Sequence, residues 1–217
     1  MTEYIYIDIL SVVLAITTLF SFTLALLFSK EYRKKLEPDI SVEEMLSLEN
    51  RIRDFLLSNN LAESYTIDLI AQTQKIKITG EVDGLPSQAQ ISSPDKDGYR
   101  FVTFRTGLSD IEKLFDLAHE CAHILNNHKT PAARPDGENK SYEDQIADYT
   151  AAALILPINK FYKTLISENY FDARRSERKK IIQKLCVIFG VNDILCVRRI
   201  KEVLLICNTE EGRLLVA

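Results

Sequence analysis

All three histidines of this 217-residue chain lie within ten residues, and two of them belong to the motif His119-Glu-Cys-Ala-His123. On an α-helix, side chains at positions i and i+4 lie one above the other, so both imidazoles could reach one metal ion. Glu120, beside the first histidine, could take a proton from the water that the metal activates. This combination predicts a metal-dependent hydrolase, with Zn²⁺ as the expected ion.

A helix beginning near Ser109 is expected to carry these two histidines. Ser109 and Glu112 have the types and spacing of a capping box, in which each side chain bonds to the backbone of the other residue. Apolar residues recur downstream with helical spacing and would form the buried stripe: Ile111, Leu114, Phe115, Leu117, Ala118, Cys121, Ala122 and Leu125. The histidines therefore fall in the middle of a predicted helix.

A catalytic zinc needs a third protein ligand and an open position, and a second, acidic helix at residues 142–157 could supply that ligand. Its residues with helical spacing toward the core are Tyr142, Ile146, Tyr149, Thr150, Ala153 and Leu154. Asp144 and Asp148 share another face. Asp144 is the favoured third ligand and Glu143 is the alternative. The competing interpretation is an acidic first turn that only complements the helix dipole.

Both segments resemble the ImmA/IrrE family of metallopeptidases. The resemblance rests on residues 114–128 and 143–157, and it extends more weakly over about residues 42–205. It implies a zincin-like domain, a zinc ion held by His119, His123 and a carboxylate, and Glu120 as the general base. Similar family members cleave helix-turn-helix repressors, so the expected substrate is a cytoplasmic regulatory protein such as a helix-turn-helix transcriptional repressor.

The chain departs from the family pattern in three places. Asp144 stands where the family has its glutamate ligand, and Thr150 stands where it usually has phenylalanine. His128 lies one residue beyond the place of a third histidine in similar proteins, so it is not counted as a ligand. Tyr149 and His128 are candidate donors to the oxyanion that forms during peptide hydrolysis.

The N-terminus predicts a membrane anchor. Residues 9–28 carry no charge and are long enough to cross the hydrocarbon core as a helix. Four basic residues follow within residues 30–35, and none precedes the run. Because basic flanks stay in the cytoplasm, we expect a single-pass cell-membrane protein with residues 1–8 outside and the catalytic domain facing the cytoplasm. A secretory signal fits poorly, since no small-residue cleavage site follows the run.

Composition agrees with a reduced, cytoplasmic domain that does not bind nucleic acid directly. The four cysteines, at 121, 186, 196 and 207, show no paired spacing, so buried thiols are expected rather than disulfides. The formal net charge of −4 argues against a general nucleic-acid binder. The last helix pair resembles a helix-turn-helix, but a comparable pair belongs to the peptidase domain in the family, where it packs.

The expected fold class is α+β, a mostly helical domain at residues 41–206 with a small antiparallel sheet. A transmembrane helix and a juxtamembrane linker at residues 29–40 precede it, and a tail at residues 207–217 follows. The expected strands are residues 75–79, 89–92 and 99–105, and the other expected helices are residues 41–57, 68–73, 159–167, 172–189 and 193–206.

A different class of protein remains as the alternative, namely a membrane-tethered regulatory or scaffold protein whose metal site is only structural. The glutamate between the two histidines disfavours it, because a structural site has no use for a general base there. An intramembrane protease is also disfavoured, since the motif lies about ninety residues beyond residues 9–28.

Overall fold

The computed structural model describes residues 40–62, 65–85, 87–128 and 141–216. The expected membrane span at residues 9–28 lies outside these ranges. None of the helices that the structure describes combines the length and the apolar character that a membrane crossing requires. The elements are α2 (Val42–Ser58), α3 (Ile67–Thr73), β1 (Ile76–Val82), β2 (Ala89–Ile91), β3 (Arg100–Arg105), α4 (Asp110–Leu125), α5 (Tyr142–Ile155), α6 (Ile158–Ser167), α7 (Arg175–Phe189), α8 (Asp193–Cys207) and α9 (Glu210–Val216).

The three strands form one mixed sheet in the order β1-β3-β2. β2 pairs with β3 antiparallel, but β1 pairs with β3 in parallel, so the prediction of an antiparallel sheet was wrong for this pair. The chain reverses direction twice between β1 and β3, and β3 lies between the other two strands. The register shifts between Ile78 and Gly80, and the hydroxyl of Thr79 there donates to Val102 O at 3.0 Å. The α+β class is otherwise confirmed.

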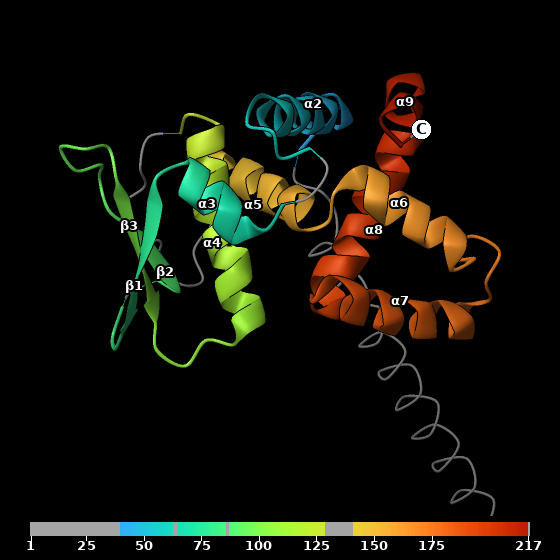
Figure 1. Ribbon diagram of the computed structural model, residues 1–217. Helices are drawn as coiled ribbons and strands as arrows, with labels where there is room; N and C mark the ends of the chain where they lie inside the picture. Colours follow the sequence, from blue (N-terminus) through green and yellow to red (C-terminus); the bar gives the residue numbers. More distant parts are fainter. Residues whose placement is uncertain (1–39, 63–64, 86, 129–140, 217) are drawn as a thin grey trace, which may run out of the picture. The chain divides into compact units, whose positions relative to one another are not determined.

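Helix α4 begins as the sequence predicts. Ser109 is its N-cap, and both bonds of the capping box with Glu112 are present. The middle of the expected stripe, from Leu117 to Ala122, is buried, and Ile111 is exposed. The other residues of the stripe are partly buried: Leu114, Phe115 and Leu125. α4 packs against α3, β2 and α5, as Figure 1 shows for the yellow-green helix and its neighbours. These contacts place the histidine-bearing turns of α4 beside the first turns of α5.

Helix α5 is almost entirely buried beyond its second turn. Its expected core residues are confirmed, with the exception of Tyr142, which is 57% exposed. Tyr142 is the first helical residue, and its hydroxyl reaches outward to donate to Glu44 on α2. Four alanines later in the helix have no exposed surface to speak of, and these small side chains allow its neighbours to approach closely: Ala147, Ala151, Ala152 and Ala153.

A buried ion cluster, called here the arginine cluster, joins α2, α5 and α8. Arg199 is 0% exposed and donates to Glu49 at 2.6 Å, to Glu202 at 3.3 Å and to Leu156 O at 2.9 Å. The hydroxyl of Tyr149 donates to the same oxygen of Glu49 at 2.8 Å. Burial raises the pKa of Tyr149, so its hydroxyl keeps its proton and remains a donor.

The segment expected to be a C-terminal tail contains helix α9, which contacts α6 and α8. Its last described residue, Val216, is buried. The four cysteines are free thiols. Cys121 and Cys196 are buried as expected, whereas Cys186 and Cys207 are only partly buried. Burial raises the pKa of Cys196 to about 12, so this thiol stays protonated at neutral pH.

Candidate metal centre

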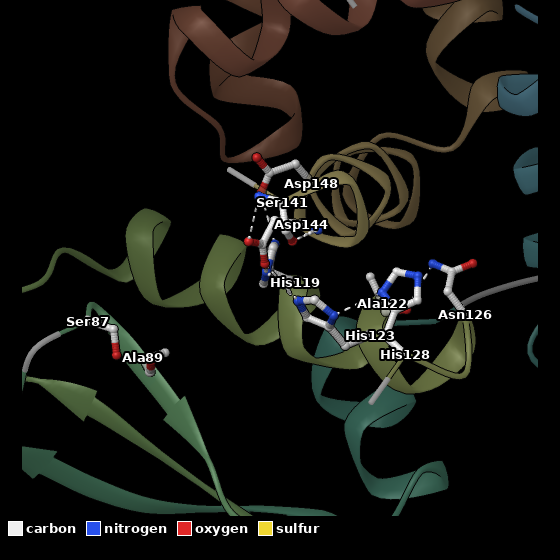
Figure 2. A network of polar contacts seen from close by, with 10 residues as sticks. All are labelled: Ser87, Ala89, His119, Ala122, His123, Asn126, His128, Ser141, Asp144 and Asp148. Atoms are coloured by element: carbon white, nitrogen blue, oxygen red, sulfur yellow. Dashed lines mark hydrogen bonds and ion pairs between the residues drawn. The ribbon is translucent and has the colours of Figure 1, made fainter. Parts of the chain in front are cut away.

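Three side chains from α4 and α5 converge on one point, and they are called here the histidine cluster: His119, His123 and Asp144. Their ligand atoms all lie within 4.8 Å of one another. The two Nε2 atoms are 2.9 Å apart, and Asp144 Oδ1 is 3.9 Å from His119 Nε2 and 3.5 Å from His123 Nε2. Figure 2 shows the two imidazoles facing the carboxylate of Asp144 from the neighbouring helix. This group could hold a metal ion.

The capping of α5 fixes the direction of the Asp144 carboxylate. Ser141 is the N-cap, and its hydroxyl accepts from the backbone N–H of Asp144 at 3.1 Å. In return, Asp144 Oδ2 accepts from the N–H of Ser141 at 3.3 Å, which leaves Oδ1 directed at the two imidazoles. Glu143, the alternative ligand, is exposed. The structure therefore brings Asp144 to the histidines, and its capping box fixes the direction of the carboxylate.

His119 is held from behind by a second carboxylate of α5. Its Nδ1 lies 2.9 Å from Asp148 Oδ1, and Asp148 is almost completely buried. A carboxylate can only accept, so a proton on Nδ1 of His119 would face an acceptor, and Nε2 would then present its lone pair toward His123 and Asp144. Such a carboxylate–histidine contact is typical of metal-ligating histidines.

The donor set fits a divalent metal of the zinc type. Two imidazole nitrogens and one carboxylate oxygen are ligands that zinc prefers, and three protein ligands leave a position open for chemistry. With Nδ1 of His119 facing the acceptor Asp148, Nε2 of His119 would direct its lone pair to the point that the Asp144 carboxylate also faces. Acceptors that converge in a buried place are stabilised by a cation.

His128 lies on the other side of His123, away from the converging atoms. The Nδ1 atoms of the two rings are 3.0 Å apart. Burial lowers the pKa of His128, which favours the neutral ring at neutral pH. The structure thus places His128 behind a ligand of the histidine cluster, outside the group of three ligand atoms.

Asn126 ties the end of α4 to both helices beside it, a role that the sequence did not suggest. Its Nδ2 donates to Thr150 Oγ1 at 3.0 Å, and its Oδ1 accepts from Arg51 of α2 at 2.7 Å. Thr150, which departs from the family pattern, is therefore an acceptor in this contact. An asparagine directly after a helical motif was the available signal, because asparagine is common at helix ends.

The remaining site residues are divided between the two clusters. Glu120 lies on α4 beside His119 and is only 7% exposed, so it shares the water-poor surroundings of the histidines. Tyr149, a candidate oxyanion donor, instead donates to Glu49 in the arginine cluster. The sequence placed Asp148 on the same face of α5 as Asp144, but its contact with His119 depends on how α4 and α5 pack.

Comparison with known proteins supports the same chemistry. Residues 87–193 match the Peptidase_M78 family model, described as the IrrE N-terminal-like domain. The matched segment runs from the residues before β2 to the first residue of α8, so it contains the whole histidine cluster. No curated protein and no solved structure matched the chain. The matched segment is similar to metallopeptidases, as the resemblance of its motifs implied.

Proposed function

We infer that this protein is a membrane-anchored, zinc-dependent endopeptidase of the ImmA/IrrE type. The observation that carries the proposal is the convergence of His119, His123 and Asp144 beside a buried glutamate on the same helix. The match of residues 87–193 to a peptidase family model supports it independently. His119, His123 and Asp144 would hold the zinc ion, and Glu120 would serve as the general base.

The proposed chemistry requires two proton transfers, one from water to Glu120 and one from Glu120 to the leaving nitrogen. A zinc ion held by His119, His123 and Asp144 would supply polarisation of a peptide carbonyl and a water molecule whose pKa is lowered toward neutrality. Glu120 accepts the proton that this water loses as its oxygen bonds to the carbonyl carbon. Glu120 then delivers the proton to the amide nitrogen as the C–N bond breaks. Asp148 keeps His119 in the required tautomer, and Ser141 keeps Asp144 turned toward the imidazoles.

The substrate that we propose is a cytoplasmic regulatory protein, such as a helix-turn-helix transcriptional repressor. The support is the resemblance of both motifs to a family whose members cleave such repressors. An aspartate in place of the family's glutamate ligand keeps a carboxylate at the same point and so preserves the chemistry.

The test of catalysis is Glu120→Gln in cells, with Glu143→Gln on the exposed side of α5 as the matched control. The amide cannot take the proton, so cleavage should fall by about 10²–10⁴-fold while zinc is retained. In the Glu120→Gln cells, quantitative proteomics should show at least one regulatory protein that accumulates at full length. The new terminus that cleavage creates in this protein should disappear. Proteomes that are the same for Glu120→Gln, Glu143→Gln and the unsubstituted protein would favour the scaffold alternative.

The anchor and its orientation are a separate proposal, supported by the uncharged residues 9–28 and the basic residues at 30–35. A reporter that is active only in the cytoplasm should be active when it is fused after Ala217. Protease added outside intact cells should leave the domain whole. Digestion from outside would indicate the opposite orientation and would leave the proposed chemistry unaffected.

A further inference from the structure

Helix α4 ends in a left-handed turn that lies between His123 and His128. Asn127 adopts a left-handed backbone conformation, with φ of 56°. Its N–H donates to Ile124 O at 3.0 Å, and the N–H of His128 donates to His123 O at 2.9 Å. This pair of bonds, five residues back from His128 and three back from Asn127, defines a Schellman motif.

In a Schellman motif, the second residue after the cap packs against the third residue from the helix end. Here these two positions are His128 and His123, so the turn brings one imidazole onto the other. The ring centroids are 5.1 Å apart at an angle of 69°, and the Nδ1 atoms are 3.0 Å apart. A contact that is usually apolar is therefore a hydrogen bond between two imidazoles in this protein.

The cap residue itself is fixed, which limits how far this turn can move. Asn126 is buried and bonds to α2 through Arg51, to α5 through Thr150 and to its own helix through Ala122 O at 2.9 Å. These three bonds hold the last turn of α4 against its neighbours. The ring of His128 thus has a defined place behind His123.

We propose that His128 is a positioning residue for His123, whose Nδ1–H donates to Nδ1 of His128 and whose Nε2 is thereby directed at the metal. This inference rests on the proposed metal centre. When Nε2 of a histidine is a ligand, its proton resides on Nδ1, and that N–H needs an acceptor. His119 has the carboxylate of Asp148 as its acceptor, and the Schellman turn supplies His128 to His123.

The test is the zinc affinity of the full-length protein, measured by competition with a chromophoric chelator. Loss of such an acceptor typically lowers metal affinity by about 10–100-fold, so His128→Ala should show a decrease in this range. His128→Phe keeps an aromatic ring but offers no acceptor, and it should lose as much as alanine. His128→Gln offers an amide oxygen and should recover most of the affinity.

The turn is tested at Asn127, which is an exposed residue. Asn127→Gly favours the left-handed conformation and should keep the zinc affinity, whereas Asn127→Val disfavours it and should lower the affinity. Unfolding temperatures of the metal-free variants provide the control for folding.

Three results would overturn the inference. If His128→Ala and His128→Phe bind zinc like the unsubstituted protein while His119→Ala does not bind it, the metal centre stands and the positioning role falls. If His128→Phe keeps the affinity and His128→Gln loses it, ring packing is the cause. A protein whose zinc binding does not change in His119→Ala would refute the metal centre itself, and the inference with it.

Discussion

Two buried polar clusters among the described residues, the arginine cluster and the histidine cluster, both contact helix α5 and differ in how their charges are balanced. In the arginine cluster, Arg199 meets two carboxylates and a backbone carbonyl, so a buried cation has its counter-ions within the fold. In the histidine cluster, a carboxylate and two imidazole nitrogens converge on the same point. The first arrangement is complete by itself, whereas the second is one that a bound cation could complete.

This difference distinguishes a cluster that stabilises the fold from the proposed metal site. Residues 144 and 148 of α5 face the histidines, while Tyr149 faces Glu49 and Arg199. The arginine cluster therefore fixes the rotation of α5 about its axis, which in turn sets where Asp144 and Asp148 lie. Substitutions in the two clusters should have different consequences.

The largest effect on stability is expected from Arg199→Met. Removal of Arg199 leaves Glu49 buried without its cation and leaves Glu202 with Arg198 alone, and the loss of one partner of a buried ion pair typically costs about 3–5 kcal/mol. Urea unfolding of the metal-free protein measures this loss. Arg198→Met, which removes a partly exposed partner of Glu202, is the control and should cost less. Equal losses in the two variants would contradict the central role of Arg199.

Asp148→Ala should act mainly on binding. Without the acceptor for its Nδ1–H, His119 is less well oriented, and zinc affinity should fall by about 10–100-fold. Glu143→Ala is the matched control on the exposed side of the same helix and should bind zinc as the unsubstituted protein does. If Glu143→Ala loses zinc and Asp144→Ala keeps it, the assignment of the third ligand is reversed.

Ser141→Ala should produce a smaller change that reaches both properties. Loss of an N-cap hydroxyl costs about 1 kcal/mol of stability, and the carboxylate of Asp144 loses part of its orientation. Ser141→Thr keeps the hydroxyl and serves as the control in thermal unfolding and chelator competition. An alanine variant with unchanged unfolding would show that the capping box contributes little.

Cys121→Ala should leave zinc affinity unchanged, although the residue lies between the two histidine ligands in sequence. Burial raises the pKa of Cys121 well above its usual range, so the thiolate that a metal would need forms only far above neutral pH. Chelator competition at neutral pH checks this. A decrease in affinity would add the thiol to the ligand set.

The site could be read from the sequence to the extent that its information is local. The spacing of His119 and His123, the capping box at Ser109 and the acidic turn at Asp144 each depend on one helix, and the structure has all three. The choice between Asp144 and Glu143 depends on the rotation of α5 against α4. That rotation is set by side-chain packing, which no single segment encodes.

The parts that the sequence did not predict are non-local. β1 pairs in parallel with β3 because β3, and not β2, is the central strand of the sheet. Alternation of apolar and polar residues within a strand does not tell which strand is central. Arg199 was also missed, although it left a signal. It stands in the apolar stripe of its helix with Cys196, Ile200 and Val203, and a charged residue there indicates a buried partner.

The most direct test of the central claim is the metal content of the full-length protein by elemental analysis after zinc reconstitution. The account predicts close to one zinc ion per chain, lost in His119→Ala and in His123→Ala and retained in Arg198→Met. A zinc-free unsubstituted protein, or histidine variants that keep the zinc content of the unsubstituted protein, would contradict it.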